Sequence, residues 1–237
     1  MTENSLYKKD SIKYILLVIF GLIILGNTNN NPEIFVQRVF RPLKFGDVTF
    51  FYAGLIPLII IYKGLKGIYT CNKAKILGTR CKRIIATIVL IVIFSNCWIF
   101  GLKTFKGFVG GLDSIYCDRE DLWLHARKVN ENEVKLSVII NLENCSSEKQ
   151  EFYIKIKTPE EWKDSIIEDE ILAKEVHSKP SNKIYMDKNE SRNFRIEATI
   201  TCKSSSYAYN SRRTNNFDFI LFNDKEEVVF KGINSLR

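Results

Sequence analysis

The residue types that most often carry enzyme chemistry are few in this chain and do not cluster. The two histidines, His125 and His177, lack the close HxH or HxxxH spacing of a metal site. Glu168, Asp169 and Glu170 form a consecutive run, whereas paired catalytic acids need opposed positions across a cleft. No nucleophile elbow, P-loop or dinucleotide fingerprint is present. We therefore expect no enzyme activity, no cofactor and no metal site; an enzyme whose cleft gathers His125 with acids is the least favoured alternative.

The six cysteines form no metal or redox motif, because no two of them have the close CxxC spacing. Cys145 and Cys202 each closely follow a stretch in which apolar residues strongly alternate. Both could then lie at one end of a β-sandwich, and our hypothesis is that they form a disulfide bridge. Spacing alone does not fix the distance between them.

The best candidate for a binding site is the polar stretch 202–216, CKSSSYAYNSRRTNN. It links two predicted core strands, so we expect a loop at one end of the domain. Tyr and Arg provide large contact areas, and Ser and Asn provide adaptable hydrogen bonds, as in antibody loops. We predict that Tyr207, Tyr209, Arg212 and Arg213 contact a partner. An ordinary mobile polar loop remains the alternative.

These candidates lie in a C-terminal region in which apolar residues recur at every second position. Between residues 133 and 142, Val134, Leu136, Val138 and Ile140 fall on one face of a strand. Related patterns cover residues 122–129, 152–156, 184–186, 194–200, 217–221 and 228–231. Roughly seven short strands with turn signals between them favour an antiparallel β-sandwich of immunoglobulin or fibronectin type III shape. Such folds host many functions, so the pattern names no ligand.

One helix start interrupts the strand pattern. Thr158, Pro159 and Glu161 form a T-x-x-E capping box with proline at the first helical position. We therefore predict a short helix or turn over residues 159–166, with Thr158 as its N-cap.

Three apolar stretches precede this region and predict three transmembrane helices, at about residues 12–27, 48–69 and 84–102. The third, IIATIVLIVIFSNCWIFGL, is uncharged and as a helix would span ~28 Å of a ~30 Å hydrocarbon core. The second contains Pro57, which membrane helices tolerate. A cleaved signal peptide is the alternative for the first, but polar residues stand where its small-residue cleavage site is expected.

The charge is divided unevenly between the two halves of the chain. Up to Leu102 there are thirteen Lys and Arg against four Asp and Glu, and after it twenty-two against twenty-three, giving the net +8. A nucleic-acid-binding protein would carry its basic excess on the soluble part, so we expect no nucleic-acid partner. The excess instead gathers from the end of the second apolar stretch to the start of the third, at Lys63, Lys66, Lys73, Lys75, Arg80, Lys82 and Arg83.

A short, acid-free basic loop is retained on the cytoplasmic side of a membrane. The N-terminus then lies on the same side, and the loop 27–47 and the C-terminal region lie outside the plasma membrane. An anionic-lipid site is the alternative explanation of the basic loop.

Together these patterns predict an α + β membrane protein. Residues 1–106 form a membrane domain, and residues 107–237 form an extracytoplasmic β-sandwich domain. We expect a membrane-anchored module that binds a protein or envelope ligand. The alternative is an accessory or sensory subunit of a transporter or of envelope machinery. Three helices, one with Pro57 and one with Asn96, favour that alternative slightly, because one helix would anchor a domain.

Overall fold

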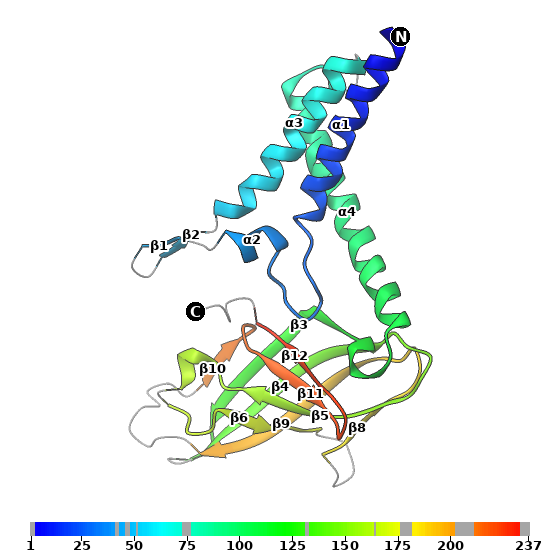
Figure 1. Ribbon diagram of the computed structural model, residues 1–237. Coiled ribbons are helices and arrows are strands. Elements are labelled where there is room, and N and C mark those ends of the chain that lie inside the picture. The colour runs from blue at the N-terminus through cyan, green and yellow to red at the C-terminus, as the bar shows by residue number, and fades with distance from the viewer. Residues whose placement is uncertain are drawn as a thin grey trace. The chain divides into compact units, whose positions relative to one another are not determined.

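A computed structural model of the 237-residue chain describes residues 3–40, 43–45, 48–50, 52–72, 77–130, 133–163, 165–175, 182–201 and 211–232. The chain forms two compact units (Figure 1). The first contains Met1–Thr28 and Glu33–Gly101, and the second contains Asn29–Pro32 and Leu102–Arg237. Four residues of the loop between the first two apolar stretches therefore belong with the C-terminal unit.

The first unit is built from helices and one short hairpin. Its elements are α1 (Glu3–Ile23), α2 (Phe35–Val39), β1 (Leu43–Phe45), β2 (Val48–Phe50), the 3₁₀ turn η1 (Tyr52–Gly54), α3 (Leu55–Asn72) and most of α4 (Arg80–Phe108). Among the described residues, two helices are long and apolar enough to cross a membrane, Tyr52–Cys71 and Arg80–Phe108. A shorter apolar helix covers Ile12–Ile23.

The helix bounds differ from those predicted. The second helix does not begin at residue 48, because Val48–Phe50 pairs with Leu43–Phe45 as a strand. These β-branched and aromatic residues suit a strand when a partner strand lies beside them. The first helix ends at Ile23, before Gly26 and the asparagine run, and α4 continues to Phe108.

Helices α1 and α3 pack closely because a glycine of each helix faces the other helix. A Cβ on Gly21 would lie 2.7 Å from Ile61, and one on Gly67 would lie 2.0 Å from the Tyr14 ring. Small residues let helix backbones approach closely in this way. In α4, the Asn96 side chain donates to Val92 O within its own helix, at 2.9 Å, rather than to a neighbouring helix.

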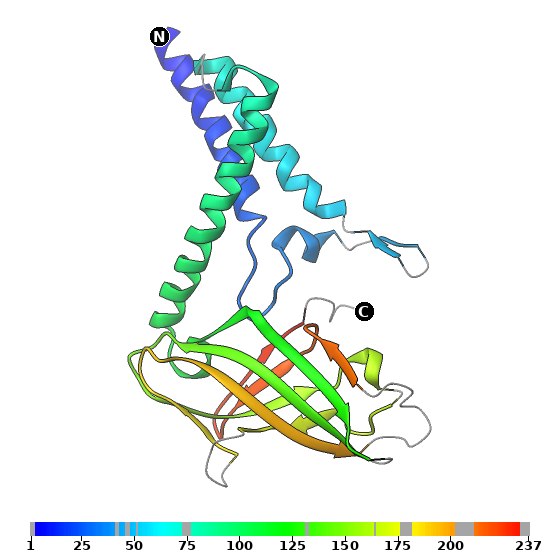
Figure 2. The ribbon, with the colours of Figure 1, turned by 180° about the vertical axis from the view of Figure 1, so that it is seen from behind.

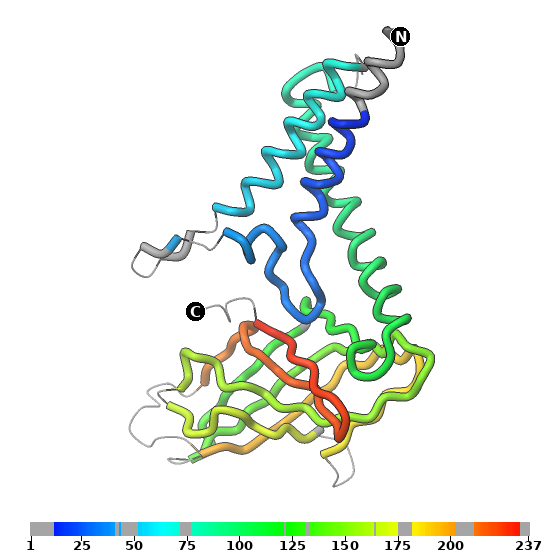
Figure 3. Tube along the Cα trace, viewed as in Figure 1, coloured from blue at the N-terminus to red at the C-terminus, as the bar shows by residue number. Residues whose placement is uncertain are grey.

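The second unit contains two antiparallel sheets. One has the strand order β10 (Ser211–Thr214), β3 (Ile115–Lys128), β4 (Glu133–Asn144), β9 (Ser191–Thr201) and β7 (Lys174–Glu175). The long strands β3, β4 and β9 lie side by side in Figure 2. The other has the order β12 (Glu227–Phe230), β11 (Phe219–Phe222), β5 (Gln150–Lys157) and β6 (Glu170–Leu172), with β8 (Ile184–Met186) also paired to β5. Figure 3 follows the chain through these strands.

The two sheets share one core, so the unit is sandwich-like. Every second residue of β4 from Val134 to Leu142 is buried, as the alternation predicted. Phe152 and Phe219 from one sheet and Phe194 from the other belong to the same apolar cluster. Truncating such a buried phenylalanine to alanine costs about 3–5 kcal/mol. The alternating strands are confirmed, and β3 and β4 pair as a hairpin.

The predicted capping box is wrong, although a turn does form there. Residues Glu160–Trp162 make only a 3₁₀ turn, and its N-cap position is Pro159, without a side-chain cap. The Thr158 hydroxyl instead donates to Glu168 O at 2.5 Å. Trp162 is 2 % exposed, and its burial in the core fixes the turn in place of a longer helix.

Candidate functional site

The predicted binding loop falls partly outside the described residues. Tyr207, Tyr209 and Cys202 belong to residues 202–210, which the structure does not describe. Arg212 and Arg213 are described, and they form an edge strand rather than a loop. In β10, Arg212 pairs with Ala126 and Arg213 pairs with His125 of β3. The free backbone edge of β3 provides these partners, which local sequence does not reveal.

Strand alternation places a second set of side chains on the outer surface of the β10-β3-β4-β9-β7 sheet. The apolar side chains of these strands enter the core, so the residues between them point outward. We call this surface the cationic face, and it comprises Arg213, Trp123, His125, Arg127, Lys135, Ser137, Ile139, Arg195, Glu197, Thr199 and Lys174. Its strands run across the second unit in Figure 2.

Aromatic and cationic groups adjoin at one edge of the cationic face. The Arg213 guanidinium lies over the Trp123 ring, 5.0 Å from its centroid. The His125 ring meets the Trp123 ring edge-on, with centroids 6.4 Å apart. A cation over an indole face contributes ~0.5–1 kcal/mol at an exposed site. This edge therefore presents a held indole ring and an exposed guanidinium to solvent.

Positive charge is in excess on the cationic face. Arg127 and Lys135 are directly opposite one another on neighbouring strands, an arrangement that destabilises a sheet when the charges are alike. Glu197 is the carboxylate of the face, and it pairs with Lys135 at 2.6 Å. Arg127 and Arg195 are exposed and form no ion pair with a described residue. The face thus carries cations that its own side chains leave uncompensated.

The ends of the same sheet are different in character. Asp118, Glu133 and Glu143 lie there, outside the cationic face. Glu143 pairs with Lys103 at 2.6 Å, and the Lys103 ammonium also lies 4.8 Å from the Tyr116 ring centroid. Glu143 is therefore partly neutralised, whereas Glu133 is the outward residue of β4 next to Lys135 and accepts from the Asn130 side chain at 2.7 Å.

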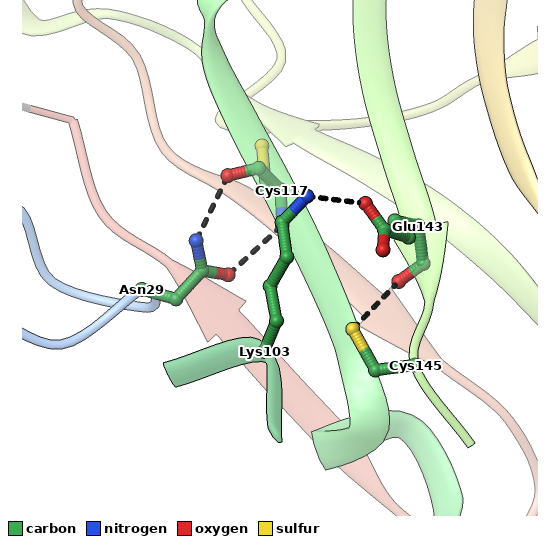
Figure 4. Close-up of polar contacts among 5 residues, drawn as sticks. All are labelled: Asn29, Lys103, Cys117, Glu143 and Cys145. Atoms are coloured by element: carbon green, nitrogen blue, oxygen red, sulfur yellow. Dashed lines mark hydrogen bonds and ion pairs between the residues drawn. The ribbon is translucent and has the colours of Figure 1, made fainter. Parts of the chain in front are cut away.

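A polar junction lies along β3, where β10 no longer covers its edge (Figure 4). The Asn29 side chain accepts from Cys117 N at 2.9 Å and donates to Cys117 O at 2.8 Å. One side-chain amide thereby replaces a missing strand neighbour. Cys117 is 1 % exposed, and burial raises the pKa of its thiol to about 12. The Cys117 thiol therefore stays protonated.

Two cations complete this junction. The Arg119 guanidinium donates to Asn29 O at 2.9 Å and to Lys231 O at 2.8 Å. Arg119 lies in the part of β3 where the register shifts, between Asp118 and Trp123. The Lys106 ammonium donates to Asp113 O at 2.7 Å and to the Asn30 side chain at 3.2 Å. These contacts tie Asn29–Pro32 into the second unit.

The premise of the predicted disulfide is wrong. Strands β4 and β9 are antiparallel neighbours, and Thr201 pairs with Glu133, at the end of β4 away from Cys145. The C-terminal ends of the two strands therefore lie at opposite ends of the sheet. The bridge itself stays a hypothesis, because Cys202 is outside the described residues. Cys145 is half-buried, and burial raises the pKa of its thiol.

The basic loop is shorter than predicted. Lys63 and Lys66 lie in α3, and Arg80, Lys82 and Arg83 lie in α4. The Arg83 side chain is buried, with its guanidinium 5.7 Å and 5.8 Å from the Tyr62 and Tyr69 ring centroids. Lys73 and Lys75 are outside the described residues. The effect of these seven residues on orientation stays a prediction.

A separate cavity of about 350 Å³ opens beside the turn at Pro159. Its lining contains Lys157, Thr158, Pro159, Glu160, Glu161, Lys163, Asp169, Glu170, Asn216, Phe217 and Asp218. Part of its charge is paired: Lys163 binds Glu160 within the lining at 2.7 Å, and Lys155, which is not in the lining, binds Glu170 at 3.4 Å. No three His, Cys, Asp or Glu side chains in the described part of the chain are placed to hold a metal ion. His125 lies on the cationic face and not in this lining.

The cationic face and Asn29 were both missed by sequence reasoning. A signal for the face existed, because basic residues recur at the polar positions of the alternating strands. Asn29 gave no signal, since it lies in a run of asparagines and its partner is far along the chain. Comparisons with known proteins add nothing here: no protein family, curated protein or solved structure matches this chain.

Proposed function

We propose that this chain is a membrane-anchored interaction module whose β-sandwich binds a ligand through the cationic face. The observation that carries the proposal is the set of uncompensated cations beside Trp123 on an exposed sheet surface. Solvated charges of one sign on neighbouring strands cost stability and attract an opposite partner. Arginine and tryptophan are also the residue types that contribute most often at binding hot spots.

The membrane placement in this proposal has the helices crossing the plasma membrane and the domain outside. The two long apolar helices support a membrane location. The N-terminal segment 12–23 supplies a third crossing if its flanking lysines reach the interface. The acid-free basic residues between α3 and α4 favour a cytoplasmic position for that connection, and parity then directs the C-terminal unit outward.

We also propose an immunoglobulin-like topology for the sandwich. The order β3-β4-β9-β7 corresponds to strands A-B-E-D of that fold, and β12-β11-β5 corresponds to G-F-C. In this correspondence β6 extends the second sheet at the C′ position, and β10 is an added strand beside A. The correspondence supports a binding role only by analogy, since one fold serves many functions.

Single-cysteine labelling on intact cells tests the proposal. Cys81 is retained in one variant, and Lys188→Cys and Thr199→Cys are introduced singly in two others, with the remaining reactive cysteines replaced by serine. Cys117 can stay, because its buried thiol has a pKa of about 12 and thiolate is the reactive form. Lys188 lies in an exposed turn, whereas Thr199 is exposed on the cationic face.

With a membrane-impermeant maleimide we expect Lys188→Cys to react and Cys81 to react only after permeabilisation. Thr199→Cys should react more slowly on cells than in purified protein, and Lys188→Cys should react equally in both. The reverse pattern for Cys81 and Lys188→Cys would place the domain in the cytoplasm. Equal rates for Thr199→Cys in both states would mean that the face is unoccupied, which ends the interaction proposal.

The second candidate function is an accessory or sensory subunit, and the Asn29 junction favours it. A tether needs one attachment, yet Asn29–Pro32 and Leu102–Phe108 both belong to the sandwich unit. The sandwich unit is thus joined along the chain to the first unit through two segments, so a force on the domain can reach the helices through both. Replacing the helices by one unrelated anchor tests this candidate: native mass in mild detergent should fall from that of a larger assembly to that of the single chain. An unchanged mass would exclude it.

A further inference from the structure

We propose that the ligand of the cationic face is an anionic polysaccharide, a chain of sugar or polyol units bearing repeated sulfate, phosphate or carboxylate groups. This inference rests on the proposed function, because it names the partner class of the same surface. It follows from the sign of the charge, its two-dimensional spacing, and the scarcity of apolar side chains on the face.

The charge pattern selects an anion. The strand registers place Arg213, His125, Ser137, Glu197 and Lys174 in one row across the sheet. The neighbouring row contains the opposed pair Arg127 and Lys135. Lys135 already pairs with Glu197, so a bound anionic group beside Arg127 would offset the repulsion that Arg127 meets from Lys135.

The spacing selects a repeating anion rather than a single small one. Neighbouring strands lie ~4.8 Å apart, so five strands extend the row over roughly 19 Å, and successive outward residues of one strand lie ~7 Å apart. Cations distributed over such a surface cannot converge on one small ion. They match a polymer whose charges recur along its length, and each contact then adds to the effective concentration of the next.

The composition favours a sugar chain over a protein partner. Trp123 and Ile139 are the apolar members of the face, whereas the buried centre of a protein interface is about 65 % apolar. The interior strands β3, β4 and β9 use their backbone groups within the sheet over this area, so a peptide could not add to them as a strand. Ser137 and Thr199 lie between the cations and can hydrogen-bond to sugar hydroxyls.

Trp123 adds an aromatic ring, and so an apolar contact, to a surface that otherwise binds through charge. Arg213 and His125 hold the indole against the sheet, which limits its rotamers before a ligand arrives. A pre-ordered ring loses little entropy on binding. The apolar C–H face of a sugar ring can then pack on the exposed part of the indole.

The test uses the full chain in nanodiscs of phosphatidylcholine, a lipid without net charge. Fluorescent dextran sulfate is the probe, with neutral dextran of the same length and poly-glutamate as comparisons. The double variant Arg127→Gln/Arg195→Gln removes two cations from the face. Lys188→Gln/Lys225→Gln is its matched control, because it removes the same charge from two exposed positions elsewhere on the unit.

We expect dextran sulfate to bind, neutral dextran not to bind, and poly-glutamate to bind at least tenfold more weakly. The face variant should lose tenfold or more in affinity for dextran sulfate, whereas the control should stay within twofold. Trp123→Ser should weaken dextran sulfate more than poly-glutamate. Binding should also weaken at least tenfold between 50 and 300 mM salt, because exposed charges are screened.

Three results would overturn the inference. If the face variant and its control lose affinity for dextran sulfate equally, the effect is one of non-specific charge. If poly-glutamate binds as tightly as dextran sulfate, the partner is an acidic polypeptide. Absence of dextran sulfate binding, with Thr199→Cys still protected on cells, would leave the proposed function standing with another partner. If Thr199→Cys is unprotected, the proposed function itself fails.

Discussion

Replacing Asn29 by alanine should open the structure locally around Cys117. The Asn29 side chain satisfies both backbone groups of Cys117, at 2.9 and 2.8 Å, and Asn29 is itself 7 % exposed. Each net hydrogen bond contributes about 0.5–1.5 kcal/mol, and each buried group left unsatisfied costs about 1–3 kcal/mol. Two such groups, with some access of water, give a local destabilisation of about 2–4 kcal/mol.

That free energy predicts a large change in the reactivity of the Cys117 thiol. Cys117 is 1 % exposed, so it reacts only when the structure opens. Every 1.36 kcal/mol shifts the opening equilibrium tenfold, so Asn29→Ala should speed the reaction by about 30-fold to about 900-fold. The assay measures maleimide modification at fixed pH in a full chain that retains Cys117 and has its other cysteines replaced.

Asn193→Ala is the matched control, because Asn193 is exposed on β9 and has no contact with Cys117. Its rate should stay within about twofold of the parent, since exposed substitutions usually change stability by under ~0.5 kcal/mol. If Asn29→Ala stays within threefold of the parent, the amide does not hold the edge of β3. If the control accelerates equally, the opening is global, and the argument from two hydrogen bonds fails.

Two further predictions concern the same unit. Gly111 has φ +67° and a Cβ there would lie 2.2 Å from the Glu226 carboxylate, which accepts from Leu112 N, so Gly111→Ala should lower the melting temperature by about 5 °C or more. Gly110→Ala has open space and an ordinary φ of −82°, and a comparable loss there would refute the reasoning. Burial raises the Cys117 pKa from 9.0 to about 12, so between those values the folded state binds more protons than the unfolded state and stability falls as pH rises. Denaturant titrations from pH 8 to 11 should show a shallower fall for Cys117→Ala than for the parent, and parallel curves would contradict the assignment.

The candidate site divides into parts that local pattern could reveal and parts that it could not. Arg213 was singled out for its residue type, yet its role beside Trp123 depends on pairing between β10 and β3. Such pairing joins residues far apart in the chain, and nothing in the spacing of either segment encodes it. The same reason explains the failed premise for Cys145, because strand direction decides which ends meet.

The sequence by itself determined the long alternating strands and the apolar helices, but not the short strands β1, β2 and β10. Side-chain burial in a sheet repeats every two residues, and membrane-length helices need an uninterrupted apolar run, so both leave a local periodic signal. It also determined that polar positions of β3, β4 and β9 would share a surface if those strands paired.

Only the tertiary structure decided which strands are neighbours, and therefore which cationic side chains lie next to one another. Arg127 faces Lys135 because β3 and β4 pair in one register, and a shift of one residue would turn every side chain to the other surface. The role of Asn29 likewise depends on an edge of β3 that β10 leaves uncovered. Long-range hydrogen bonding set both features, because unpaired backbone groups at a buried edge must find partners wherever the fold supplies them.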